Sequence, residues 1–327
     1  MTPRKRIIKT RRFGPRTCFL CSRTMRSQDY TEEHIFPKWL QKLFLLWNQN
    51  ITLINETRIS YKQLKVPCCK QCNNDHLSKL ESRIAAAFQK GASAVRELSE
   101  LDLYLWLGKI YFGILYKEYL LSHDRSKPKS EPIIPRKLLN ELDLHHLYLQ
   151  SAHASIEFHG PPGSIFVFDL QLHQTKQYQF NYWDSLDMIA TCRIGRVGIM
   201  AAFTDGGIMK QAMEPMFSMY YSKVLHPLQF DELTARFVYN VKRMQRTVSS
   251  LTIESDAGQI ISIPNVPGFS LKPWFGPWVI EDYTKVLAHI LKLPLELVFH
   301  PPDEFYTLLT NEQGKFCEMD VNDGNWP

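Results

Sequence analysis

Residues 18–21 read Cys-Phe-Leu-Cys, and residues 69–72 read Cys-Lys-Gln-Cys. A Cys-x-x-Cys pair places two thiolates on one tight turn, and two such turns supply the four ligands of a tetrahedral zinc site. The 47 residues between the pairs, 22–68, exceed the usual spacing of a zinc ribbon, so we expect a folded insertion between the two turns. We predict one structural zinc ion, held by Cys18, Cys21, Cys69 and Cys72. Cys68 leaves a second register open, in which Cys68 replaces Cys69, and the match to the first turn favours Cys69.

Charge is divided unevenly along the chain. The 327 residues carry 39 Lys and Arg against 33 Asp and Glu, a formal net charge of +6. Residues 1–90 hold 18 basic and 6 acidic side chains, which leaves 21 basic and 27 acidic ones for residues 91–327. The first part therefore has a net charge of +12 and the second of −6. Opposite signs of this kind suggest that a part built for a polyanion is joined to a part that is not.

Composition excludes several classes of protein. A hydrophobic content of 44% with 12% aromatic residues excludes a disordered chain. The longest nearly apolar run, Leu101–Tyr116, contains Asp102 and Lys109 and is too short and too charged to span a bilayer. No apolar segment follows the basic N-terminus, so no secretory signal is expected. These features predict a cytoplasmic protein without membrane contact, in which cysteines serve as metal ligands or buried thiols.

The basic part divides into an arm and a small folded unit. Residues 1–17 form the predicted arm, in which no carboxylate relieves the positive charge. Such an arm is either a solvated terminus or a source of salt-dependent affinity for a nucleic-acid backbone. Residues 18–90 form the predicted unit. The residues that we expect to contact phosphates are Arg4, Arg6, Arg11, Arg12, Arg16 and Lys70.

Periodicity predicts the secondary structure of both parts. In the small unit we expect a helix over 37–47 whose aromatic residues pack the core, a hairpin of 51–54 with 58–66, and a helix from about 73 to 91. In residues 91–327 we expect helices over 101–121, 136–151, 229–246 and 283–291. Strands are expected over 155–158 and 164–170, twice within 188–204, and as a hairpin over 251–263. The expected class is therefore α+β, with a larger mixed α+β domain after a small N-terminal one.

Residues with catalytic potential lie beside the two cysteine turns. Residues 31–37 read Thr-Glu-Glu-His-Ile-Phe-Pro, and Asn73-Asn74-Asp75-His76 follows directly on the second turn. A neutral histidine can deprotonate water near pH 7. A divalent ion on hard oxygen ligands can bind a scissile phosphate and stabilise the leaving oxygen. This combination favours metal-assisted phosphodiester hydrolysis.

In this order, the motifs resemble those of the HNH (ββα-metal) endonucleases, in the subgroup with a four-cysteine zinc site. The resemblance covers about residues 15–85 and implies that residues 18–90 are a zinc-clamped nuclease domain that hydrolyses DNA. It implies that His34 is the general base and that Glu33, where the family more often has Asp, holds a catalytic Mg²⁺ or Mn²⁺ ion with Asn73. His76 would be an alternative ligand or a phosphate contact, and Asn74 is a weaker substitute for Asn73.

One element of the family pattern is missing. The family usually has an Asn about five residues before the second Cys-x-x-Cys, where it orients the catalytic histidine. This chain reads Tyr-Lys-Gln-Leu-Lys-Val over residues 61–66. Either Gln63 takes the role of that Asn, or the backbone around His34 does so alone. The missing Asn supports an alternative function, a zinc-containing DNA-binding module without catalysis.

The acidic part, residues 91–327, shows no catalytic constellation. A nuclease joined to a large domain of different charge resembles the layout of bacterial antiviral effectors, whose second domain senses a signal or binds a partner. We therefore expect residues 91–327 to regulate the nuclease through a protein partner or a small ligand, and a homo-oligomer is compatible with this layout.

Overall fold

The computed structural model describes residues 12–322, apart from residues 125, 128–129, 155, 247, 249, 256–257 and 263–272. Contacts group the chain into two compact units. The first contains Met1–Gln89, Leu98–Pro162 and Ser250–Ile263, and the second contains Lys90–Glu97, Gly163–Ser249 and Pro264–Pro327. Helices are mixed with largely antiparallel sheets, which confirms the α+β class. The compact units cut across the boundary at Gly91 that charge suggested, and the functional division into 1–17, 18–90 and 91–327 stays a prediction.

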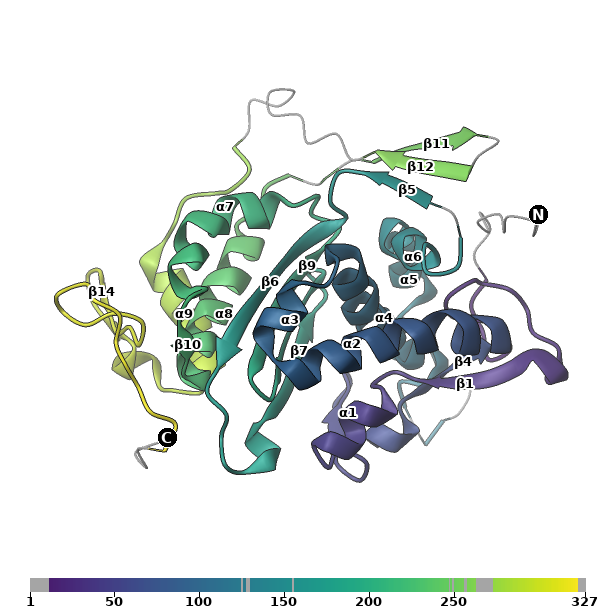
Figure 1. Ribbon diagram of the computed structural model, residues 1–327, viewed down its shortest axis with the longest axis horizontal. Coiled ribbons are helices and arrows are strands. Elements are labelled where there is room, and N and C mark those ends of the chain that lie inside the picture. Colours follow the sequence, from purple (N-terminus) through teal and green to yellow (C-terminus); the bar gives the residue numbers. More distant parts are fainter. Residues whose placement is uncertain are drawn as a thin grey trace. The chain divides into compact units, whose positions relative to one another are not determined.

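In the first unit, two strands that are distant in sequence form the hairpin-like pair next to the cysteines. Strand β1 (Tyr30–His34) pairs antiparallel with β4 (Lys65–Cys69), so that Tyr30 lies opposite Cys69 and His34 opposite Lys65 (Figure 1). A π-helical turn, Gln71–Leu77, and helix α2 (Ser78–Lys90) follow β4 directly. The second Cys-x-x-Cys therefore spans the junction between a strand and a helix, and this helix begins two residues before the predicted Asn73.

The insertion between the cysteine pairs differs from its prediction. Helix α1 covers only Lys38–Leu43, because Phe44 caps it and Leu45 adopts a left-handed backbone with φ of 57°. Leu40 and Phe44 are buried as expected, but Trp47 is 41% exposed. The predicted hairpin is shorter too, since β2 (Asn50–Thr52) pairs with β3 (Arg58–Ser60) and the following residues join β4.

A long buried helix organises the first unit. Helix α4 (Glu100–Leu120) matches the predicted 101–121 and is capped at its start by the Ser99 side chain, which accepts a hydrogen bond from the Asp102 backbone. It is buried on nearly all sides. A Cβ at Gly113 would lie 3.1 Å from Ile35 Cγ1, so this glycine lets α4 approach the segment after β1. The remaining elements of this unit are α5 (Arg136–Glu141), α6 (Asp143–Gln150), β5 (Ile156–His159), β11 (Leu251–Ser255) and β12 (Gly258–Ser262).

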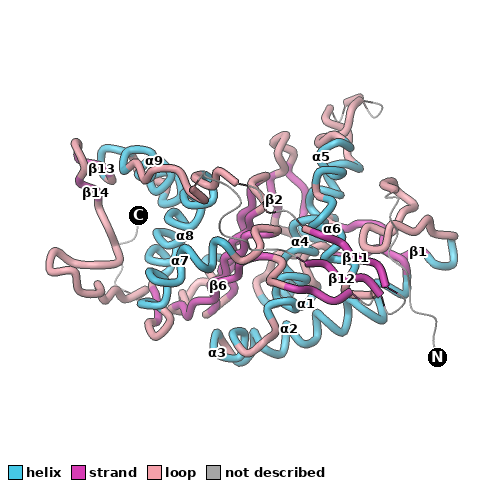
Figure 2. The backbone as a smooth tube through the Cα atoms, turned by 90° about the horizontal axis from the view of Figure 1, so that it is seen from above, coloured by secondary structure: helices cyan, strands magenta, loops and turns pink. Residues whose placement is uncertain are grey.

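The second unit is a sheet with helices packed on it. Its strand order is β10-β6-β9-β8-β7, antiparallel except for the parallel pair of β10 with β6. Helices α7, α8 and α9 lie together beside β6 (Figure 2). The strands are β6 (Gly163–Leu170), β7 (Phe180–Ser185), β8 (Ile189–Ile194), β9 (Val197–Phe203) and β10 (Val224–Leu225). The helices are α3 (Ala92–Arg96), α7 (Ile208–Phe217), α8 (Pro227–Lys242) and α9 (Ile280–Leu291), with a small ribbon of β13 (Phe299–His300) and β14 (Glu304–Phe305).

None of the helices in the described part of the chain combines the length and the apolar character that crossing a bilayer needs.

Candidate functional site

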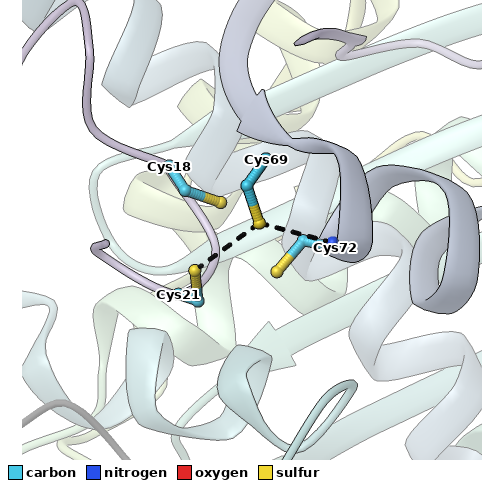
Figure 3. A group of neighbouring side chains, drawn as sticks. All are labelled: Cys18, Cys21, Cys69 and Cys72. Carbon is cyan, nitrogen blue, oxygen red and sulfur yellow. Dashed lines mark hydrogen bonds between the residues drawn. The ribbon is translucent and has the colours of Figure 1, made fainter. Parts of the chain in front are cut away.

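Four cysteine side chains gather at the base of the β1–β4 pair. The Sγ atoms of Cys18, Cys21, Cys69 and Cys72 all lie within 4.8 Å of one another, and all four residues are buried (Figure 3). A tetrahedral zinc ion with bonds of about 2.3 Å to sulfur separates its sulfur ligands by about 3.8 Å. The 3.9 Å between the Sγ atoms of Cys21 and Cys69 matches this edge length. The cluster is therefore compatible with a structural zinc ion, as predicted.

The two turns that carry these cysteines have the local geometry of zinc knuckles. At the first turn, the Ser22 backbone donates to the Cys18 carbonyl, and Ser22 adopts a left-handed φ of 53°. At the second, the Cys72 backbone donates to Cys69 Sγ (Figure 3). Arg23 donates to the same sulfur at 3.4 Å, which places a positive charge against the thiolates. Such contacts orient metal ligands and stabilise their deprotonated form.

Cys68 is the fifth cysteine of this region and lies next to the cluster. Its Sγ is 3.9 Å from that of Cys18, but it does not belong to the group of four that could hold a metal. The register with Cys69 is therefore the one that the structure adopts. No other group of three or more His, Cys, Asp or Glu side chains in the described part of the chain gathers closely enough to hold an ion.

The carboxylate of Glu33, the predicted ligand of a catalytic ion, lies in a buried ionic triad. Lys109 Nζ of α4 donates to Glu33 Oε1 at 2.6 Å and also to Glu81 Oε1. Both Glu33 and Lys109 are buried. Burial raises the pKa of Glu33 to about 7. Burial opposes the charge of Lys109, but the two carboxylates outweigh it and hold the pKa of Lys109 above its usual range.

His34, the predicted general base, points to the other face of β1. Successive side chains of a strand alternate between faces, so His34 shares its face with Glu32 and with Lys65, its partner on β4. Its ring stacks on Trp47 at 6.0 Å between centroids. Burial, helped by the charges of nearby lysines, lowers the pKa of His34 to about 4. The Nε2 atom is buried and has no hydrogen-bond partner among the described residues.

The backbone of His34 is held by a residue that sequence reasoning missed. Lys109 Nζ donates to the His34 carbonyl at 3.3 Å, in addition to binding Glu33. Gln63, the predicted substitute for the missing Asn, instead accepts a hydrogen bond from Ser60 Oγ and is exposed. The side chain that contacts the histidine backbone is therefore that of Lys109 on α4, and not that of Gln63.

Asn73 and His76 lie on the helical turn after Cys72 and have different surroundings. Asn73 Nδ2 donates to Thr31 Oγ1 at 3.0 Å and reaches the Glu32 carbonyl at 3.4 Å, so it ties the turn to β1. His76 faces away toward His153, with 6.1 Å between the ring centroids. It lines a cavity of about 280 Å³ together with Asp75, Lys79 and Arg83. The structure thus brings Asn73 to β1 but directs His76 to a separate cavity.

Of the six residues predicted to contact phosphates, the structure describes three. Arg4, Arg6 and Arg11 lie outside the described residues. Arg12, Arg16 and Lys70 are exposed, as a contact to a polyanion requires.

Comparisons of the chain with protein-family models, with curated proteins and with solved structures found no match.

Glu32 and Lys109 are the two residues of this region that sequence reasoning overlooked. The alternation of a strand over residues 30–34 places Glu32, and not Glu33, on the face of His34. Lys109 stands alone as a cation in the middle of a predicted apolar helix, where a charge needs a buried partner. Both signals were present in the sequence.

Proposed function

We propose that the chain is a metal-dependent endonuclease of the HNH type that hydrolyses phosphodiester bonds in DNA. The observation that carries this proposal is the arrangement of two antiparallel strands and a following helix around a four-cysteine cluster, with His34 at the end of the first strand. Zinc would be structural, because all four cysteine positions are buried and leave no ligand position for a substrate.

His34 is the residue that we propose to accept a proton from water. Its lowered pKa keeps the imidazole neutral at pH 7, as a base requires, although it also makes the base weak. Lys109 fixes the backbone of His34 from behind the strand. Lys65, the partner of His34 on β4, supplies positive charge for the DNA backbone near this position, and the exposed Lys70 supplies it at the other end of the strand pair.

The predicted ligand pair for a catalytic Mg²⁺ or Mn²⁺ ion does not fit this arrangement. Glu33 is bound to Lys109 on the face opposite to His34, and a cation there would have to displace the ammonium group. The carboxylate on the His34 face is that of Glu32, which pairs with Lys65 at 3.3 Å. We therefore derive no step through a divalent ion at Glu33.

The variant His34→Ala tests the catalytic proposal. Plasmid cleavage in Mg²⁺ or Mn²⁺ should disappear, while zinc content and DNA binding remain as in the wild type. His159→Ala is the matched control, because its exposed ring pairs only with Glu157 of the same strand. Cleavage by His34→Ala at the wild-type rate would exclude His34 as the base.

The second candidate is a zinc-containing DNA-binding module without catalysis, and the triad of Lys109 with Glu33 and Glu81 favours it. The measurement that separates the two candidates is plasmid incubation with each metal, with and without EDTA, beside a binding assay. DNA binding without cleavage in any metal would favour the module.

Residues 91–327 would then regulate the nuclease, as in an effector of bacterial antiviral defence that responds to a protein partner or a small signal. Co-purification from the native host tests this part. A protein that is isolated alone and cleaves DNA fully would contradict it.

A further inference from the structure

The first unit contains a cavity of about 550 Å³ that adjoins the proposed cleavage site through Glu32 and Lys65. It is bordered by β1, by β3 and the turn after it, and by the end of α4. Its size is typical of pockets for small molecules. The lining residues are Glu32, Thr57, Arg58, Ile59, Lys62, Gln63, Lys65, Lys117, Leu121, Ser122 and Ile133.

Positive charge dominates the cavity. Four cations line it, Arg58, Lys62, Lys65 and Lys117, against the single carboxylate of Glu32. Glu32 pairs with Lys65, and Lys62 donates to Asn48 Oδ1 at 2.8 Å. Within the described part of the chain, no ion pair neutralises Arg58 or Lys117. The cavity therefore keeps a net positive charge in which an anion of several charges would be stabilised.

Lys117 is the cation that most requires such a partner. It is half-buried on α4, two turns after Lys109, and burial lowers its pKa. Lys109 on the same helix forms ion pairs with two carboxylates, which offset its desolvation. The carboxylate that acts on the charge of Lys117 is that of Glu32, and Glu32 already pairs with Lys65. A bound anion would stabilise the ammonium group of Lys117 against this desolvation.

Apolar side chains also line the cavity. They are those of Ile59, Leu121 and Ile133, and Ile133 is only 9% exposed. Thr57, Gln63 and Ser122 add hydroxyl and amide groups to the lining. A ligand that suits the whole cavity carries several negative charges at one end and a flat apolar body with polar edges at the other.

We propose that this cavity binds a nucleotide, with its phosphates at Lys62, Lys117 and Arg58 and its base against the apolar side chains of the lining. The site would be a position for a small regulatory ligand in the first unit. The proposal does not depend on the nuclease activity, because binding can be measured whether or not the chain cleaves DNA.

Isothermal titration of the zinc-loaded full chain with ATP, AMP and inorganic pyrophosphate tests the proposal. We expect ATP to bind more tightly than pyrophosphate, since pyrophosphate has no base to contact the apolar side chains. Lys117→Gln should weaken ATP binding at least tenfold, and so should Arg58→Gln, which changes an exposed side chain and leaves folding intact. Lys137→Gln is the control, because its side chain is 86% exposed and is not part of the cavity lining.

Three results would overturn the proposal. Absence of binding by either nucleotide at millimolar concentration would show that the cavity is no nucleotide site. Equal affinity for pyrophosphate and ATP would reduce it to a simple anion site. Binding of a single-stranded oligonucleotide that both variants weaken, without binding of AMP or ATP, would make the cavity part of a nucleic-acid path.

Discussion

The first compact unit contains a buried cysteine cluster beside a buried ionic triad, whereas the second is built on an interlocked aromatic and aliphatic core that also buries the ion pair of Glu232 with Arg236. In the first, Lys109 is 1% exposed beside two carboxylates, and four cysteines form a second polar centre. In the second, aromatic rings of the sheet and of the helices interlock, with 4.8 Å between the ring centroids of Phe166 and Phe217. Phe230 and Phe237 continue this core, and both are almost fully buried.

The two kinds of core differ in what stabilises them and in whether they contain reactive groups. An apolar core stabilises a fold without offering reactive groups. Buried charges and thiols stabilise it only while each has its partner, because an unpartnered buried charge is costly. The first unit should therefore be sensitive to metal removal, and the second should not.

Loss of zinc should have the largest effect. Cys69→Ser should abolish binding of one zinc ion per chain and unfold the β1–β4 pair, since structural zinc contributes about 10–16 kcal/mol of apparent binding free energy in small zinc domains. Hydrogen exchange should show lost protection at residues 30–34 and 65–69, with β8 and β9 unchanged.

Cys68→Ser is the matched control for this experiment. Cys68 is as buried as Cys69 and adjacent to it, but it lies outside the group of four. This variant should keep its zinc ion. If both variants lose zinc equally, the assignment of ligands is wrong.

Removal of the central cation should have the next largest effect. Lys109→Met leaves the buried Glu33 and the half-buried Glu81 without their ammonium partner, and breaking a buried pair costs about 3–5 kcal/mol. Urea unfolding of the two proteins measures this loss. Lys117 on the same helix forms no ion pair with a carboxylate among the described residues, so Lys117→Met should cost less than about 1 kcal/mol. Similar losses for the two variants would contradict the role of the triad.

Acid should destabilise the first unit through a buried histidine. His145 contacts Tyr104 Oη at 2.9 Å and the Gly108 carbonyl at 3.2 Å, and burial lowers its pKa to about 4. The unfolded chain, with a histidine pKa of about 6.5, takes up this proton first as pH falls. Stability from this group is therefore complete above pH 6.5 and decreases between pH 6.5 and 4. At pH 5 the loss is about 2 kcal/mol.

Urea unfolding of wild type and His145→Gln at pH 7 and pH 5 checks this expectation. The variant should lose about 2 kcal/mol less than the wild type on acidification. His34 and His226, whose pKa values are also lowered by burial, contribute equally to both proteins and cancel in the difference. An identical acid loss in both proteins would show that His145 titrates normally.

The elements that the sequence predicted well are those with a strong local signal. The apolar run of α4 was predicted to within one residue at each end, and β8 and β9 were found within the predicted 188–204. The cysteine cluster was predicted from spacing alone. In each case, the residues that determine the structure are close in sequence or repeat a simple spacing.

The elements that were missed depend on distant contacts. Lys109 meets Glu33 across 76 residues, and no local pattern indicates that pairing. Helix α7 was not predicted, because it follows a glycine turn and contains Pro215 near its end. Helix α1 was predicted too long, since periodicity does not reveal the left-handed backbone at Leu45.

The smallest expected effect compares two neighbours on β1 and tests which face of the strand carries chemistry. Glu33→Gln keeps an oxygen that accepts from Lys109, so it should cost only about 1 kcal/mol of stability. Glu32→Gln changes an exposed carboxylate and should cost less than about 0.5 kcal/mol. If the face of His34 is catalytic, Glu32→Gln should nevertheless slow plasmid cleavage more than Glu33→Gln does. The reverse order would return Glu33 to the catalytic site and require that the triad opens when DNA binds, which hydrogen exchange at α4 in the presence of DNA would detect.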